Sequence, residues 1–269
     1  MVFIVKVPSI NGMGRTKGCE KTGNAVLGSL KEIYVNEQGR RIDVKNLDLE
    51  EIHLDNSNLE FSNELIYKNA FEIYETKPKV FFIGGDHSIS YSLARAFFDY
   101  CQNSEKEPCL IVFDAHADCV NLADRKFPTH EEWLRGLIED GFPSENILLV
   151  GTRNYHKDEL EFLKEKRIRI ISMNQLLEDL NDTCEIIMEF TSGRELYVSI
   201  DIDVIDPVFA PATFYSEPGG LSSREFIYII QRINKMKNLR AIDLVEINSE
   251  KDHKNFTVRL GAKILGEFL

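Results

Sequence analysis

Short, almost continuous apolar runs alternate along this chain with longer stretches in which apolar residues recur at helical spacing. Such runs are typical of strands that are buried on both faces of a parallel sheet. They predict strands at residues 1–7, 80–83, 109–113, 147–151, 168–171, 196–200 and 241–245. The stretches between them predict helices at residues 24–33, 58–75, 89–100, 130–140, 157–166 and 182–191, and two more that start near residues 222 and 256.

Strands followed by helices from end to end predict an α/β fold, in which helices cover both faces of a mainly parallel central sheet. Ser88 is expected to cap one helix, and the box formed by Ser222 and Glu225 to cap another. The stretch 34–54 is irregular and could hold two short strands. Because no Pro-, Gly- or Ser-rich linker divides the chain, we expect residues 1–269 to form a single domain.

Charge and cysteine content narrow the class of protein. The net charge of −12 argues against nucleic acid or an anionic membrane surface as the main partner. Apolar runs are all much shorter than a membrane span. The five cysteines are odd in number and include no C-x-x-C pair, which favours a reduced protein over a disulfide-linked one. We therefore expect a soluble, cytoplasmic protein.

Potential metal ligands directly follow the predicted strands. Asp114, His116 and Asp118 come after one strand, and Asp201 and Asp203 after another. In extended chain, alternate residues point to the same side, about 6–7 Å apart. The carboxyl ends of parallel strands also meet at one edge of the sheet. Carboxylates gathered there would repel one another unless cations held them, so the pattern predicts a metal site.

The predicted ligand set combines four carboxylates with two imidazoles: His87, Asp114, His116, Asp118, Asp201 and Asp203. This is more than one ion needs, and it suits two ions that share bridging carboxylates. The oxygen-rich set favours Mn²⁺ over a cysteine-based zinc site, and two such ions can activate water as a nucleophile. Taken separately, the second aspartate pair could cap a helix and His87 could be a hydrogen-bonded loop residue. Their joint occurrence at strand ends favours the metal.

These residues resemble the signatures of the ureohydrolase (arginase/agmatinase) family. Gly84 to Ser88 matches its G-G-D-H-S segment, Asp114 to Asp118 its D-A-H-x-D segment, and Ser199 to Pro207 its S-x-D-x-D-x-x-D-P segment. The resemblance covers about residues 78–269. It implies a three-layer α/β/α fold, two Mn²⁺ ions per chain, and hydrolysis of a guanidino group to urea and an amine by a metal-bridging hydroxide. It also implies a homo-oligomer, either a trimer or a hexamer.

The resemblance implies a role for each matched residue. One ion would be held by His87, Asp114, Asp118 and Asp201, and the other by Asp114, His116, Asp201 and Asp203. Asp118 would orient the hydroxide, Glu246 would pair with the guanidinium, and His130 would pass a proton to the leaving amine. The match at His130 is looser, because Glu131 follows it where the family usually has glycine. A surface histidine at a helix start is the alternative there.

The chain departs from the family pattern around the substrate. Phe214 and Tyr215 stand where Gly-Thr-Pro usually begins, so aromatic rings would narrow the pocket and Tyr215 would contact the substrate. Asn154 lies in a stretch where arginases have aspartates, one of which contacts the substrate's α-amino group. The loop after Asp118 lacks the serine that helps to hold an α-carboxylate, although Asn121 could contribute. These differences favour a small cationic guanidino or amidine substrate that is agmatine-like rather than arginine.

Other activities stay open on sequence alone. They are a formiminoglutamase-type or deacylase-type metal amidohydrolase, and a non-catalytic homologue that keeps the metals to bind a ligand. The full ligand set and Glu246 argue against the deacylase, whose site generally uses one Zn²⁺. Three further histidines have no motif around them and are expected to be structural or solvent-facing: His53, His156 and His253.

Overall fold

One sheet of eight parallel strands runs through residues 2–12 and 14–269, the part of the chain that the computed structural model describes. Its strands are β1 (Phe3–Val7), β2 (Leu49–Glu51), β3 (Val80–Gly84), β4 (Pro108–Phe113), β5 (Ile147–Val150), β6 (Arg169–Ile171), β7 (Glu195–Asp201) and β8 (Leu239–Val245). Their order across the sheet is β2-β1-β3-β8-β7-β4-β5-β6, and each neighbouring pair is parallel.

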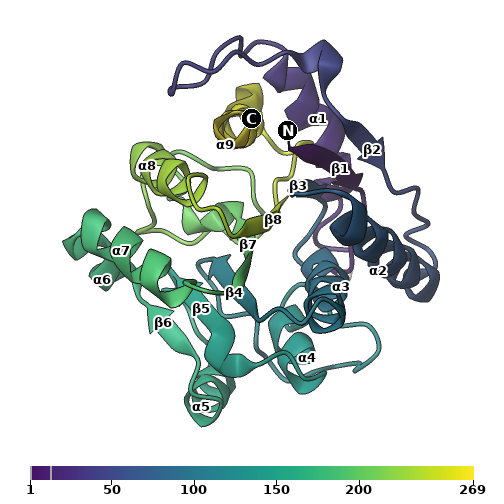
Figure 1. Cartoon of the computed structure of the whole chain (residues 1–269), viewed down its shortest axis with the longest axis vertical. Coiled ribbons are helices and arrows are strands. Elements are labelled where there is room, and N and C mark those ends of the chain that lie inside the picture. Colours follow the sequence, from purple (N-terminus) through teal and green to yellow (C-terminus); the bar gives the residue numbers. More distant parts are fainter. Residues whose placement is uncertain (1, 13) are drawn as a thin grey trace.

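Helices cover both faces of the sheet (Figure 1). One face carries α1 (Thr22–Leu30), α6 (Met173–Glu178), α7 (Leu180–Phe190), α8 (Ser223–Ile233) and α9 (Phe256–Phe268). The other carries α2 (Leu59–Thr76), α3 (Ile89–Asn103), α4 (Trp133–Glu139) and α5 (Lys157–Glu165). The predicted three-layer α/β/α fold with a parallel central sheet is confirmed.

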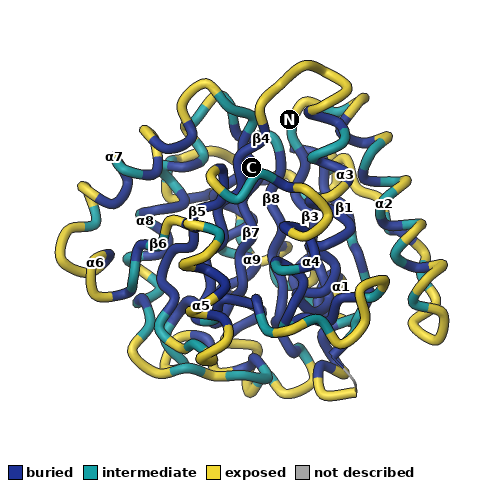
Figure 2. The backbone as a smooth tube through the Cα atoms, turned by 90° about the horizontal axis from the view of Figure 1, so that it is seen from below, coloured by how far each residue is buried: buried dark blue, intermediate teal, exposed yellow. Residues whose placement is uncertain are grey.

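Strand residues alternate between the two hydrophobic layers. In β3, Phe81 and Ile83 pack under the α1 and α9 side, whereas Val80 and Phe82 pack under the α2 and α3 side. Every residue of β3 is buried. In Figure 2 the central strands are dark blue, and exposed residues lie on loops, on the outer faces of helices and on the edge strands β2 and β6. This two-sided burial explains why the strands appear in the sequence as continuous apolar runs.

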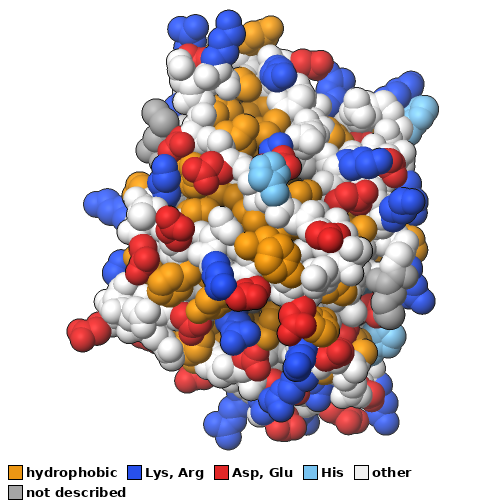
Figure 3. All heavy atoms as spheres, turned by 90° about the vertical axis from the view of Figure 1, so that its right-hand side faces the viewer, with side chains coloured by type: hydrophobic (Ala, Val, Ile, Leu, Met, Phe, Trp, Pro, Cys, Tyr) orange, Lys and Arg blue, Asp and Glu red, His pale blue; other side chains and the backbone are white. Residues whose placement is uncertain are grey.

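Charged side chains of both signs are spread over the molecular surface. Figure 3 shows them interspersed with hydrophobic side chains on the side of the molecule where α2 lies. The acidic excess is therefore not gathered into one patch on this face. Across the described ranges, no helix combines the length and the apolar character required to cross a bilayer.

Three local expectations differ from the structure. Helix α6 was not predicted, although Ser172 and Gln175 form a capping box at its start. The stretch 34–54 contains one strand, β2, with an isolated bridge between Val35 and Arg41 and a short 3-10 helix (Val44–Asn46), and the Asn36 side chain accepts backbone N–H groups that close the turn of the bridge. Ser88 precedes α3 but has helical backbone angles, and its hydroxyl donates to Asp86 instead of capping the helix.

Candidate metal centre and active site

The four central strands bring the predicted site residues to one edge of the sheet. β3, β8, β7 and β4 are neighbours, and their carboxyl ends lead to His87, Glu246, Asp201 and Asp114. Phe113 pairs with Ile200 across β4 and β7, so the aspartates that follow these two residues lie level with each other. Strand register therefore assembles side chains that are far apart in the sequence.

The ligand atoms form two groups that share Asp114. In the first, His87 Nδ1 lies 3.1 Å from Asp114 Oδ2, 2.9 Å from Asp118 Oδ2 and 3.3 Å from Asp201 Oδ2. In the second, His116 Nδ1 lies 2.9 Å from Asp203 Oδ2 and 3.6 Å from Asp114 Oδ1. Within the trio of His87, Asp114 and Asp201, and within that of Asp114, His116 and Asp203, the ligand atoms lie within 4.8 Å of one another. All six predicted ligands are thus brought together.

Two of these buried atoms have no hydrogen bond. Among the described residues, neither His87 Nδ1 nor Asp114 Oδ2 has a hydrogen-bond partner, although both are buried. Buried polar atoms are normally paired, and leaving them unpaired is costly. A divalent cation between them would satisfy both. The donor set therefore fits metal ions, and its oxygen-rich composition suits a cation such as Mn²⁺.

Crowding of the carboxylates shifts their protonation. Burial and the charge of Asp114 raise the pKa of Asp118 to about 7. Burial and the charge of Asp203 raise the pKa of Asp201 well above its usual range. Burial alone would lower the pKa of His116, but contacts with Asp114 and Asp203 outweigh it and raise that pKa to about 12. In the metal-free protein, protons thus supply the positive charge that the carboxylates require.

Two of the site residues have an unusual backbone conformation. Asp118 and Glu246 both adopt the left-handed conformation, with φ of 50° and 63°. This conformation costs roughly 1–2 kcal/mol for a non-glycine residue, and such strain clusters at functional sites. Gly85 is required by close packing, because a Cβ there would lie 1.9 Å from the carbonyl oxygen of Ser9. The G-G-D-H segment can therefore pass under the N-terminal loop only with glycine at this position.

A buried hydrogen-bond chain fixes the ring of His87. Its Nε2 lies 2.9 Å from Ser199 Oγ, and the Ser199 hydroxyl donates to Asp243 Oδ1 at 2.7 Å. Tyr197 and Ser90 donate to the other oxygen of Asp243. Since the Ser199 proton is committed to Asp243, its oxygen accepts the Nε2 proton of His87. Nδ1 is then the ring nitrogen that faces the carboxylates and is left for a metal ion.

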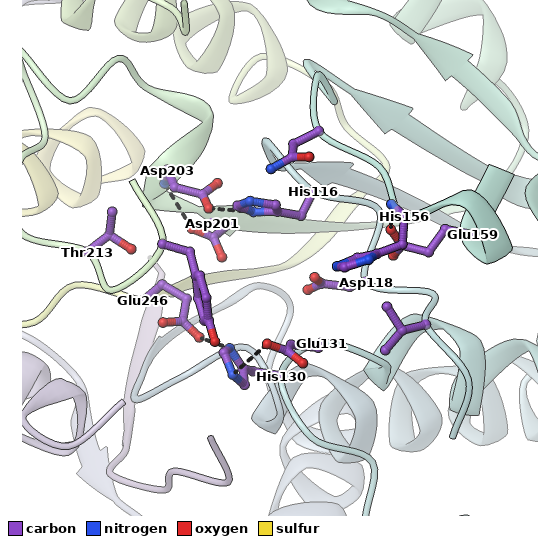
Figure 4. Close-up of a pocket in the computed structure, with 13 residues that line it drawn as sticks. His116, Asp118, His130, Glu131, His156, Glu159, Asp201, Asp203, Thr213 and Glu246 are labelled. Atoms are coloured by element: carbon purple, nitrogen blue, oxygen red, sulfur yellow. Dashed lines mark hydrogen bonds and ion pairs between the residues drawn. The ribbon is translucent and has the colours of Figure 1, made fainter. Parts of the chain in front are cut away.

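A cavity of about 250 Å³ opens over the ligands (Figure 4). Its lining comes from the ends of several strands and from the loops that follow them: His116, Asp118, Val120, His130, Glu131, Asn154, His156, Glu159, Asp201, Asp203, Thr213, Tyr215 and Glu246. Carboxylates and imidazoles make up most of this lining. Within the described residues, no lysine or arginine belongs to it.

His130 and Glu246 meet at one side of the cavity, as Figure 4 shows. His130 Nδ1 lies 3.3 Å from Glu246 Oε1, which also accepts the backbone N–H of His87 at 2.9 Å. Burial alone would lower the pKa of His130, but the hydrogen bond and charge of Glu246 outweigh it and raise the pKa to about 9. Over the described ranges, the other polar atoms, His130 Nε2 and Glu246 Oε2, are buried without a hydrogen bond.

The predicted substrate residues lie in different places. Tyr215 lines the cavity and stacks on His130, with 5.4 Å between ring centroids, and its hydroxyl accepts from Arg15 at 2.6 Å. Phe214 packs edge-on against Tyr215. Asn121 is exposed on the loop after Asp118, and its amide donates to Asp158 Oδ2. In the described part of the chain, Asn121 is not among the residues that line the cavity.

Sequence reasoning missed several residues at the site. Glu131, Glu159 and His156 line the cavity, and His156 is exposed there, at the start of α5. Trp133 donates its indole N–H to Asp118 Oδ2 at 2.8 Å. The stretch that includes His156 follows the carboxyl end of β5, so its position after a strand was an available signal. Trp133 gave none, because its contact depends on how α4 packs.

Comparison with known proteins gives consistent matches. The Arginase family model matches residues 1–269. Agmatinase of Bacillus subtilis (strain 168) is 30% identical over 230 residues, which cover 84% of this chain and 75% of that protein. Arginase of Staphylococcus aureus (strain MRSA252) is 27% identical over 298 residues, covering 99% and 96% of the two chains. In fold, formimidoylglutamase from Bacillus subtilis subsp. subtilis str. 168 matches with a TM-score of 0.88 at 24% identity, covering 99% of this chain and 85% of the other.

Proposed function

This chain belongs to the arginase family, and on that premise we propose that residues 1–269 form one catalytic domain that binds two Mn²⁺ ions and hydrolyses an agmatine-like guanidino compound to urea and an amine. The family's members are hydrolases of C–N bonds in guanidino and amidino groups, so the hydrolase class follows from membership. The identity of the metal, the number of bound ions and the identity of the substrate are our proposal.

The observation that carries the metal proposal is a pair of buried atoms without a hydrogen bond, His87 Nδ1 and Asp114 Oδ2, which lie 3.1 Å apart. One ion would be held by His87, Asp114, Asp118 and Asp201, and the other by Asp114, His116, Asp201 and Asp203. When bound, two such ions supply the electrostatic activation that turns water into a nucleophile near neutral pH.

Glu246 would hold the amidinium group of the substrate. Its Oε1 is occupied by the His87 backbone N–H and by His130, while Oε2 is buried and free among the described residues. An amidinium N–H donated to Oε2 would form a charge-assisted hydrogen bond whose direction is already fixed. The reacting carbon would then lie beside the ligand groups.

Two further side chains would manage protons. Asp118 lines the cavity and can accept a hydrogen bond from the attacking water, which orients its lone pair towards the amidine carbon. The pKa of His130 is about 9 in the metal-free chain, and its Nε2 makes no hydrogen bond within the described residues, with Glu131 Oε1 4.0 Å away. As the C–N bond breaks and the electron pair passes to nitrogen, Nε2 would give its proton to the leaving amine.

The lining of the cavity supports a substrate without a carboxylate. Glu131 and Glu159 line it in addition to Glu246, and no lysine or arginine does so in the described residues. A substrate carboxylate would face negative charges there, whereas an amine at the far end of the molecule would be attracted. This favours an agmatine-like compound over arginine or formiminoglutamate.

We also propose that the protein is cytoplasmic and forms a homo-oligomer, either a trimer or a hexamer. Light scattering would measure the mass of this oligomer.

The test is urea release by the Mn²⁺-loaded protein from agmatine, arginine, guanidinobutyrate, guanidinopropionate and free guanidine. Formiminoglutamate, followed by formamide release, runs beside them. The control is the double variant His87→Ala, Asp114→Ala, which removes ligands from both groups. Turnover of agmatine above the other compounds, lost in the control, is the expected result. Equal rates in the control, or silence across the panel with two ions bound, would overturn the proposal.

A further inference from the structure

Trp133, the only tryptophan of the chain, contacts two predicted ligands at once. It is the first residue of α4 and is completely buried. Its Nε1 donates to Asp118 Oδ2 at 2.8 Å, and its ring lies against the ring of His87, with centroids 4.7 Å apart. Both of these residues belong to the group that would hold one of the two proposed ions.

The indole hydrogen bond occupies a lone pair of a ligand atom. A buried tryptophan has one polar atom, a donor, which needs an acceptor. The acceptor here is Asp118 Oδ2, the same oxygen that lies 2.9 Å from His87 Nδ1. With one lone pair taken by the indole, the other is directed at the ligand group. The hydrogen bond thus selects one orientation of the carboxylate.

Asp118 needs such a support more than Asp114 and Asp201 do. Asp114 and Asp201 follow or end paired strands, whereas Asp118 lies further along the loop with φ of 50°. Helix α4 holds it from two directions, since the Arg135 backbone N–H donates to the Asp118 carbonyl while Trp133 holds the side chain.

We propose that Trp133 is a positioning residue that sets the orientation of Asp118 and the plane of the His87 ring, and thereby the affinity of the ion they share. This inference rests on the proposed function, because it concerns the same metal centre. Trp133 also connects Asp118 with His130, the two residues proposed to handle protons. It contacts Asp118, and His130 lies three residues before it on the segment that leads into α4. Outer contacts of this kind typically change metal affinity by roughly 10–100-fold.

The sharpest test removes only the N–H group. Because the chain has a single tryptophan, its replacement by 3-benzothienylalanine, which has sulfur in place of N–H, changes this one position. Mn²⁺ affinity is measured by calorimetric titration of the metal-free protein, and bound metal is counted after dialysis. We expect the affinity for one of the two ions to fall roughly 10–100-fold while the other is retained. Trp133→Phe should behave likewise, with circular dichroism to check that it folds.

The matched control is Tyr74→Phe, which also removes a buried aromatic donor, in this case one that donates to the carbonyl of Leu93 in the α2–α3 layer. It should bind Mn²⁺ as the unmodified chain does. Emission from Trp133 in the unmodified chain gives a second readout, since Mn²⁺ bound beside the indole should quench it. Unchanged affinities in the benzothienyl protein would overturn the positioning role. Weakened binding in that protein, with no turnover of any substrate by the unmodified one, would overturn the proposed function alone.

Discussion

Glu246 and His130 form a buried ion pair, with 3.3 Å between Oε1 and Nδ1, and the same Oε1 accepts the backbone N–H of His87. The carboxylate that would bind the substrate cation is thus anchored to both the proton donor and the loop that carries a metal ligand. Its second oxygen needs no rearrangement to receive an amidinium N–H. Preorganisation of this kind reduces the ordering cost on binding.

Replacing Glu246 by glutamine should separate substrate binding from metal binding. Gln keeps the size of the side chain and an acceptor oxygen, but it removes the charge that pairs with the amidinium. Because hydrogen bonds to charged groups are worth about 1.5–3 kcal/mol, we expect kcat/KM for agmatine to fall roughly 10–150-fold. Steady-state rates and metal analysis on the same sample measure both quantities. Loss of metal together with activity would contradict the role given to Glu246.

His130 should make the stability of the metal-free protein depend on pH. Its pKa is about 9 in the folded chain, above the usual 6.5, so its protonated form favours folding. The contribution is fully present below pH 6.5 and is lost as pH rises through about 9. His130→Gln should therefore be less stable than the unmodified chain at pH 6, by up to about 3 kcal/mol, and equally stable at pH 10. Urea denaturation of the chelator-treated proteins gives the two curves, and a constant gap would refute this account.

Ser199 should influence metal binding without touching the metal. Ser199→Ala removes the acceptor of the His87 Nε2 proton and one donor to Asp243. The ring is then free to rotate or change tautomer, and we expect Mn²⁺ affinity to fall roughly tenfold or more. Ser62→Ala, a buried serine in α2 that donates to the carbonyl of Asp55, is the matched control. Calorimetric titration compares the two, and equal affinities would show that Ser199 has no such influence.

Two glycine substitutions should have opposite effects. In Gly85→Ala the new Cβ would lie 1.9 Å from the Ser9 carbonyl, so the backbone must shift, at a cost of about 1–3 kcal/mol. The shift would displace His87, and bound metal should decrease. In Gly28→Ala the Cβ meets nothing within 4 Å in helix α1, and stability should rise by about 0.5–1 kcal/mol. Thermal denaturation and metal content test both, and an unchanged Gly85→Ala protein would contradict the clash.

The sequence was most informative for site residues that directly follow a buried strand. His87, Asp114 and Asp201 occupy fixed positions after buried strands, and parallel strands end at a common edge, so their convergence follows from local pattern and fold class together. Glu246 also directly follows a strand, although its role was implied by the family resemblance. The three-layer fold was predictable because buried parallel strands leave an unmistakable apolar run.

Contacts that depend on helix packing could not be predicted in this way. Trp133 contacts Asp118 because helix α4 packs against α3. No short sequence motif predicts this packing. Asn121 lies close to Asp118 in sequence, yet its amide donates to Asp158 on α5. Side chains on loops are placed by the elements they happen to pack against, whereas those at strand ends are placed by the ladder itself.

The strand order has a consequence for how the chain folds during synthesis. β8 lies between β3 and β7, although it is the last strand to be synthesised. Until β8 inserts, β3 and β7 each have an unpaired edge. The part of the sheet that ends in β3, before His87, is then not joined to the part with β7 and β4, which leads to the aspartates. Such long-range closure is slow, and it exposes strand edges to other chains in the meantime. A nascent chain that has completed residue 203 carries every predicted metal ligand but cannot yet hold them in place, so metal capture should report that the last strand has been inserted.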